Sequence, residues 1–450
     1  MFSIITNIFK IPELRKRIFF TLGLLIVYRI GCYIPTPGIN SQALSDIFAH
    51  LTKVRGGTIF GLMDIFSGGA ISKCTIFALG IMPYISASII MQLLTAVIPH
   101  LEKLSKEGEV GRKKINQYTR YGTVVLSVFQ GYMIAVGLQN PSSIFGSIAA
   151  NVQIAPEGLG FRLLAMLTLT SGTVFIMWLG EQVTERGIGN GISLIITTSI
   201  ISRAPTAVID AWNVFSPLNP EKATQPLGLL IVMLILFIGV VAAVIVVTQG
   251  QRQIPVQYAK RIVGRKVYGG QRTYIPLKVN QAGVIPIIFA SALLMFPATL
   301  GSFVPSLRFL SDYLAPGAPL YTLLYILFIV FFCYFYTAIT FNPVDVADNM
   351  RKYGGFIPGI RPGKNTADYL DRVMTRVTIS GAIFLAGIAI LPSLISGQAR
   401  LSFTITQFFG GTSLLILVGV MLDTMRQVES HLLMRHYDGF MKKGKMRGRF

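Results

Sequence analysis

Charged side chains are scarce in this chain. Of its 450 residues only 13% are Asp, Glu, Lys or Arg, whereas 52% are hydrophobic, and the mean hydropathy is +0.61. Soluble globular domains carry about 25% charged residues. The composition therefore excludes an ordinary soluble enzyme and indicates a protein that crosses a membrane several times.

Cysteine is almost absent too. Cys32, Cys74 and Cys333 form no CxxC pair and no cluster of metal ligands. The sequence therefore gives no sign of a disulfide framework or a metal site, and we expect no cofactor. We expect Cys32 and Cys74 near the outer face as free thiols.

Patterns that carry catalysis are missing as well. No Ser/His/Asp arrangement, HExxH helix or carboxylate pair falls within the apolar stretches. The phosphate-binding pattern GxxxxGK[ST] fails around Lys364, because Pro358 and Asn365 stand where glycine and Ser or Thr belong. We predict that the chain is not an enzyme.

Few ionisable residues lie near the apolar stretches. Arg29, Arg162, Arg203 and Arg376 fall close to their ends, where snorkelling to the interface would satisfy the charge. The Asp/Glu/His relay of a proton-coupled pump is missing.

Ten apolar stretches are long enough to predict transmembrane helices. Their approximate bounds are 18–34, 75–98, 121–138, 161–180, 191–209, 227–248, 283–300, 320–341, 373–396 and 407–424.

Positive charge is distributed unevenly around these stretches. The net charge is +21, and 30 of the 40 Lys and Arg residues precede the first stretch, follow an even-numbered one, or lie in the tail. Because Lys and Arg accumulate on the cytoplasmic side, we expect both termini there. Met1 to Arg17 lacks the apolar core of a cleavable signal peptide.

The ten stretches divide into two sets of five with opposite orientation. We predict a cytoplasmic segment 1–17, halves at 18–209 and 227–424, an external hinge at 210–226 and a basic cytoplasmic tail at 425–450. Inverted halves are typical of proteins whose pathway lies between them. The expected fold class is an all-α polytopic membrane protein with ten helices in a clamshell around a pore.

A helix too short to span the membrane stands directly before the second stretch. Ile59, Leu62, Met63 and Phe66 recur at helical spacing, and Thr58 is a plausible N-cap. The helix would cover about 12 to 15 Å, against a hydrocarbon core of about 30 Å. At membrane depth it must therefore be buried in protein or line a water-filled cavity.

Isoleucine pairs and prolines mark the spans. Ile81 with Ile85, and Ile192 with Ile196, lie one helical turn apart, although periodicity alone does not separate pore-lining from core or lipid-facing isoleucines. We expect Pro83 and Pro286 to kink the second and seventh spans.

Two long cytoplasmic loops are expected to dock a partner. The loop 249–282 carries seven basic residues and no acidic one, and the alternation around Ile254 and Ile275 predicts a protruding β-ribbon. Its docking candidates are Arg252, Lys260, Arg261, Arg265 and Lys266. In the loop 342–372, prolines and glycines surround Arg361 and present it outward.

Four runs resemble the SecY family, the channel subunits of the bacterial Sec preprotein translocase. They are Phe77–Ile90 (FALGIMPYISASII), Trp178–Ser193 (WLGEQVTERGIGNGIS), Gly359–Gly363 (GIRPG) and Gly410–Ile416 (GGTSLLI). They keep the family's order, and the similarity extends over essentially the whole chain.

The resemblance implies a closed pore with a plug and a lateral gate. It implies an apolar pore ring of Ile81, Ile85, Ile192, Ile196, Ile285 and Ile416. It makes the short helix, at about 58–72, a plug whose apolar residues are Ile59, Phe60, Leu62, Met63, Ile65 and Phe66. The plug is expected to rest against the ring through weak packing, and the spans carrying Pro83 and Pro286 flank the gate.

The resemblance also implies function and partners. Such a channel passes unfolded secretory polypeptides across the bacterial plasma (inner) membrane and releases apolar segments sideways into lipid. Its companions are SecE and SecG in a heterotrimer, and its basic loops dock the motor ATPase SecA or the ribosome. The alternative, a secondary transporter of small solutes, also fits ten spans and broken helices but needs polar groups at the midplane.

Overall fold

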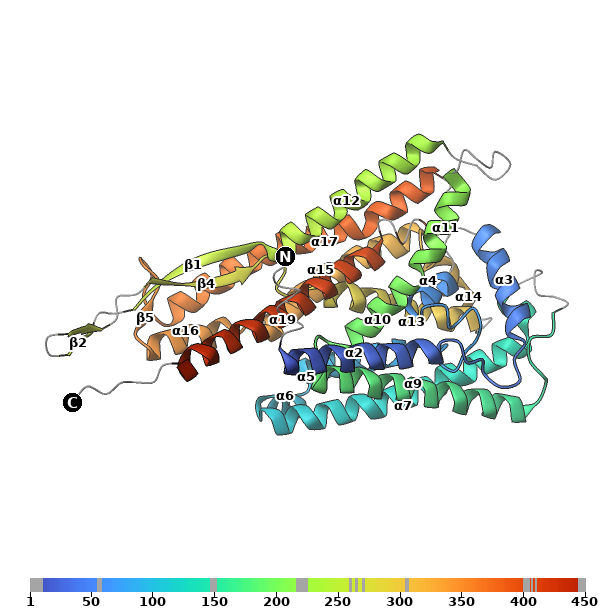
Figure 1. The fold of residues 1–450 in the computed structure, drawn as a ribbon, viewed down its shortest axis with the longest axis horizontal. Coiled ribbons are helices and arrows are strands. Elements are labelled where there is room, and N and C mark those ends of the chain that lie inside the picture. The colour runs from blue at the N-terminus through green and yellow to red at the C-terminus, as the bar shows by residue number, and fades with distance from the viewer. Residues whose placement is uncertain are drawn as a thin grey trace.

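The computed structural model describes residues 11–54, 59–145, 152–215, 226–258, 261–263, 266–268, 272–303, 307–399, 405, 408 and 411–443. Long helices form two inclined groups with shorter helices between them (Figure 1). The helices of the first half are α2 Pro12–Gly31, α3 Ser41–Val54, α4 Ile59–Phe66, α5 Met82–Val97, α6 Pro99–Lys106, α7 Glu109–Gln139, α8 Pro141–Phe145, α9 Leu159–Arg186, α10 Gly191–Ser202 and α11 Ala204–Phe215.

The second half adds helices and a small sheet. Its helices are α12 Leu227–Gln249, α13 Ile285–Phe303, α14 Arg308–Tyr313, α15 Pro319–Thr340, α16 Pro343–Lys352, α17 Lys364–Ala399 and α19 Thr412–Lys443. Its strands are β1 Gln251–Tyr258, β2 Arg261–Val263, β3 Lys266–Tyr268, β4 Arg272–Lys278 and β5 Gly355–Phe356.

Each of the ten predicted spans overlaps a helix. In the part of the chain that the structure describes, seven helices are long and apolar enough to cross a membrane, and α5 with α6 makes an eighth, bent by 99°. The first and tenth stretches lie on α2 and α19, which also carry charged residues. The chain is therefore an all-α polytopic membrane protein.

The two groups of helices meet along α10, α13 and α19. Helices α2, α7 and α9 pack together at the bottom of Figure 1, and α12, α15 and α17 slant above them. Between the groups, α10 contacts α19, and α13 contacts α5 and α7. The short helix α4 contacts both α10 and α13, so it lies where the two groups meet.

The prediction that two prolines kink their spans is wrong. Helix α5 begins at Met82, so Pro83 lies in its first turn, and Pro286 is likewise the second residue of α13. Proline is tolerated there because the first amide groups of a helix have no intrahelical acceptor. Residues 76–81 form turns instead of the predicted start of the second span, and the proline inside α13 is Pro297.

The predicted ribbon forms and continues into the second loop. Strands β1 and β4 pair antiparallel with Ile254 opposite Ile275, and β5 pairs with the end of β1. Most of the segment expected to be a loop at 342–372 is ordered as α16, β5 and the start of α17. Buried side chains from both loops form one small core, which contains Ile254, Val256, Leu277, Met350, Ile357, Leu370 and Met374.

The expected external hinge is partly helical. Helix α11 continues through Asp210 to Phe215, whereas residues 216–225 lie outside the described residues.

Glycines allow some helices to pack directly against the backbone of a neighbouring segment. A Cβ atom at Gly172 on α9 would lie 1.9 Å from the carbonyl oxygen of Ile76, and one at Gly191 would lie 1.9 Å from that of Gly180. Such close approach is the packing that small residues permit between membrane helices.

We predict that Gly172→Ala destabilises the protein by about 1 to 3 kcal/mol, because the new methyl group must displace backbone. Thermal unfolding in detergent would measure the change. Gly160→Ala on the same helix is the matched control, since nothing lies within 4 Å of its Cβ position. Equal effects of the two substitutions would contradict the explanation.

Candidate functional site

The predicted short helix exists and is enclosed by the spans. Helix α4 has eight residues, and its described side chains from Gly61 to Phe66 are all buried. The predicted cap Thr58 and the side chain of Ile59 lie outside what the structure describes. As the bilayer argument requires, neighbouring helices and loops surround the helix.

The apolar side of α4 and the predicted ring belong to one cluster of buried side chains. From the helix come Leu62, Met63, Ile65 and Phe66, each at most 8% exposed, and from the predicted ring come Ile81, Ile85, Ile196 and Ile416, each at most 3% exposed. Ile192 and Ile285 are partly buried and pack against the same cluster.

Most of these isoleucines lie in or just before the first two turns of a helix, and Ile196 lies midway along α10. Ile81 precedes α5 and accepts the amide hydrogen of Ile85 at 3.1 Å, which keeps the pair one turn apart. Ile192 is the second residue of α10, which Asn190 caps by accepting from the amides of Ile192 and Ser193. Ile285 is the first residue of α13. The cluster therefore gathers the ends of several helices.

One residue of the predicted plug packs outside the cluster that contains the isoleucines. Phe60 packs in a second cluster, with ring centroids 6.2 Å from Phe48, 5.7 Å from Phe145 and 6.0 Å from Phe303. An apolar pocket lies beside these rings and also touches Met63. Helix α4 is therefore held between two apolar clusters, whereas the sequence predicted contact with the ring alone.

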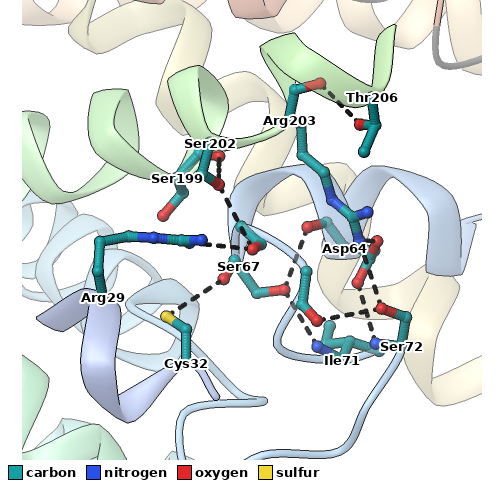
Figure 2. A network of polar contacts seen from close by, with 12 residues as sticks. Arg29, Cys32, Asp64, Ser67, Ile71, Ser72, Ser199, Ser202, Arg203 and Thr206 are labelled. Carbon is teal, nitrogen blue, oxygen red and sulfur yellow. Dashed lines mark hydrogen bonds and ion pairs between the residues drawn. The ribbon is translucent and has the colours of Figure 1, made fainter. Parts of the chain in front are cut away.

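The end of α4 is also held by polar contacts from α2. Arg29 donates from Nη1 to the carbonyl oxygen of Gly68 at 3.1 Å, and from Nη2 to the Tyr33 hydroxyl. The Tyr28 hydroxyl shares a hydrogen bond of 2.6 Å with Ser199 of α10 and donates to Ser67 O at 3.4 Å. Figure 2 shows Arg29 reaching across to this segment.

An ion pair joins α4 to the break between α10 and α11. Arg203 is the residue between the two helices, and its guanidinium pairs with Asp64 of α4. It also donates to Ser72 Oγ at 3.3 Å, and the Ser72 amide donates to Asp64 Oδ1 at 2.9 Å. Ser202 Oγ donates to Gly68 O at 3.4 Å (Figure 2).

Two glycines are required in this segment. Gly68 and Gly69 have φ angles of +67° and +91°, a backbone conformation that side chains disfavour. A Cβ at Gly68 would lie 3.0 Å from Arg29 Nη1, and one at Gly69 would lie 3.0 Å from Arg203 Nη2. The turn therefore brings the backbone within reach of both arginines.

The expectation that these arginines merely snorkel is wrong for Arg29 and Arg203. Arg29 binds the segment after α4, and Arg203 binds Asp64 of α4 and Ser72 after it. Arg162, near the start of α9, donates from Nε to Gln139 Oε1 at 2.6 Å. Sequence reasoning also missed Asp64, although a carboxylate inside an eight-residue apolar helix was a visible signal that a cation lies opposite.

The predicted docking residues fall in three classes. Arg252 on β1 is exposed. Arg361 is also exposed, on a turn in which Gly359 and Gly363 have φ angles of +82° and +101°. Arg261 and Lys266 lie on β2 and β3, whose side chains are not described, and Lys260 and Arg265 lie outside the described residues. In Figure 1 the sheet projects from the helices at the end opposite α3 and α14.

These features define a class of protein: a polytopic membrane protein that encloses a short helix among its spans. The chain belongs to the SecY family, whose profile matches residues 75–425.

Curated relatives cover the chain almost completely. It is 49% identical to the protein translocase subunit SecY of Escherichia coli (strain K12), over 97% of this chain and 96% of that one. It is 45% identical to the same subunit of Thermotoga maritima, over the full length of both.

Solved structures share the fold. One described as a protein conducting channel has a TM-score of 0.63 at 19% identity and covers 92% of this chain and 91% of its own. Another, of a SecY protein whose plug domain is described as stabilising the closed state, has a TM-score of 0.62 at 18% identity, with the same coverage.

Proposed function

We propose that this chain is the channel subunit of a protein translocase. It conducts unfolded secretory polypeptides across the bacterial plasma membrane and releases apolar segments sideways into lipid. The observation that carries the proposal is the burial of α4, a helix too short to span, in one cluster with isoleucines from α10, α13, α19 and the start of α5. Membership of the SecY family supports it.

Ile81, Ile85, Ile192, Ile196, Ile285 and Ile416 form the pore ring, and α4 is the plug. A narrow apolar constriction excludes ions because water leaves it, yet it gives a passing polypeptide no fixed polar site to bind. The plug closes the outer side by the packing of Leu62, Met63 and Phe66 and by its polar contacts. This chain provides the path for the polypeptide, and a partner protein provides the energy that moves the polypeptide through it.

The lateral gate lies between α5 and α7 on one side and α13 and α15 on the other. Support comes from the contacts of α13 with α5 and α7, which hold the two groups of helices together. A signal sequence contains about 7 to 15 consecutive apolar residues. Their transfer from water to lipid is favourable by roughly 25 cal/mol for each Å² of apolar surface removed from water. Pro83 and Pro286 lie at the starts of their helices and therefore do not bend them. Pro297 lies inside α13, so it is the position where a gate helix would bend.

The sheet of β1, β4 and β5, with the Arg361 turn, forms the cytoplasmic docking surface. Its partners are the motor ATPase SecA and the ribosome, whose RNA attracts positive charge. Solved structures of the same fold include Sec61 in a ribosome-channel complex, with a TM-score of 0.58 at 17% identity.

The proposal also includes the subunits and the topology. SecE and SecG complete the heterotrimer. Both termini of this chain are cytoplasmic, and its halves 18–209 and 227–424 are inverted repeats.

A stalled precursor should crosslink to a photoreactive residue placed at position 85 or 285, because both positions line the proposed path. The measurement is a covalent adduct between the purified chain and a precursor fused to a folded domain. A residue placed at exposed position 238 on α12 is the control. A transporter of small solutes would show no polypeptide contact at either ring position.

Replacing Ile85 and Ile196 together with glycine should make reconstituted vesicles leak ions, because the widened constriction stays wet. Conductance across a planar bilayer measures the leak. The matched control replaces Ile90 and Ile201, which lie on the same helices but are each 47% exposed. Unchanged conductance in the first variant would remove the ring from the seal.

Arg361→Glu should slow translocation of a purified precursor by about tenfold, if the docking contact contributes roughly 1.4 kcal/mol. Resting conductance should not change, because Arg361 lies on the turn between β5 and α17, and β5 belongs to the sheet that projects from the helices (Figure 1). Arg308→Glu, exposed on α14 at the opposite end, is the control. A leaky variant with normal transport would refute the docking role.

A further inference from the structure

Two charged residues have no part in an apolar seal. Asp64 belongs to α4, the proposed plug itself, and Arg203 lies next to it, between α10 and α11. Their side chains are only 13% and 25% exposed. A pair removed from water is less screened by salt than a surface pair, and loss of one member leaves the other charge without compensation. The pair therefore favours the plug position seen here.

The residues that hold the plug share one face of α10 with two ring isoleucines. Ile192, Ile196, Ser199 and Arg203 follow at spacings of four, three and four residues, which places them along one stripe of a helix. From Ile196 to Arg203 the stripe is about 10 Å long. A displacement of the isoleucines would therefore also displace Ser199 and Arg203.

The contact is built so that it can open. Arg203 Nε is buried without a hydrogen-bond partner among the described residues, so the guanidinium is only partly satisfied in the closed position. Asp64 has an alternative donor in the Ser72 amide, at 2.9 Å, which travels with the plug. The carboxylate would therefore keep one hydrogen bond after the two residues separate.

We propose that the Asp64–Arg203 pair is a latch that holds the plug closed, and that α10 releases it when a polypeptide pushes its isoleucines outward. This inference rests on the proposed channel function and adds the step that links the ring to the plug.

Cys32 is a reporter already present in the chain. Its thiol is 3% exposed and lies 4.0 Å from the carbonyl oxygen of Ser67, in the segment that follows the plug (Figure 2). Movement of that segment uncovers the thiol. The rate at which N-ethylmaleimide alkylates Cys32, assigned by mass spectrometry in the intact reconstituted complex, therefore reports plug opening without any precursor.

Asp64→Asn and Arg203→Gln should each accelerate alkylation of Cys32 by about tenfold, equivalent to 1.4 kcal/mol. The double variant should react more slowly than either single variant, because neither charge is then left unpaired. Arg203→Lys should stay close to the original rate. Asp46→Asn, at an exposed position on α3, is the control for loss of a nearby carboxylate.

Two outcomes would overturn the latch. One is an unchanged alkylation rate in both single variants. The other is a double variant that reacts as fast as the product of the single effects, which would mean that the two side chains act independently. Accumulation of each single variant at normal levels, with an unchanged melting temperature, shows that its faster alkylation does not come from misfolding.

A stalled precursor tests the link to the ring. It should accelerate alkylation of Cys32 in the original chain but add little in Asp64→Asn, where the latch is already open. Equal acceleration in both would overturn the role of α10. If no precursor enters the original chain, the proposed channel function fails, whereas the alkylation rates without precursor still decide the latch.

Discussion

The backbone of a short helix within a membrane needs partners for its unpaired ends. Hydrocarbon offers no hydrogen bonds, so each unsatisfied amide or carbonyl group is costly there. In this protein the carbonyl oxygens after α4 receive hydrogen bonds from Arg29, Tyr28 and Ser202, which come from two different spans. The arrangement of α2, α10 and the Gly68–Gly69 turn follows from that requirement. So short a helix is possible here because neighbouring helices supply the hydrogen bonds that its end needs.

This requirement also explains why the segment of α4 carries polar residues at all. A purely apolar helix would pack against the isoleucines but leave its C-terminal end unsatisfied. Asp64 and the two glycines bring that end to the arginines, and the apolar side chains of α4 pack in the cluster that contains the isoleucines. The apolar packing and the polar contacts thus use different residues of one short segment. Substitutions in the two sets of residues have different consequences. A change of an apolar residue alters the packing in the buried cluster, whereas a change of Asp64 or of the glycines alters the contacts with the arginines.

Much of this architecture could be predicted from the sequence because the bilayer imposes strong rules. Apolar length predicted a polytopic helical protein, and helical spacing predicted α4 as a short helix. Alternation predicted the pairing of β1 with β4. The starts of helices were less predictable, since Pro83 and Pro286 fit either a kink or a first turn and the surrounding packing decides between them. The partners of Arg29 and Arg203 could not be predicted either, because they come from residues 39 and 139 positions away in the chain. Such contacts depend on how the helices pack, and no local pattern records that.

Strand β5 has a consequence for how the protein can evolve. It pairs with β1, and Ile357, the residue after it, belongs to the same buried cluster as Ile254 and Leu277, so two loops separated by three helices form one folded unit. A substitution in either loop must therefore remain compatible with the other, so the two are expected to covary among homologues. An exchange of the hairpin between species would need to carry 350–374 with it. The surface formed by the sheet is inherited as a pair of segments, although the gene encodes them apart.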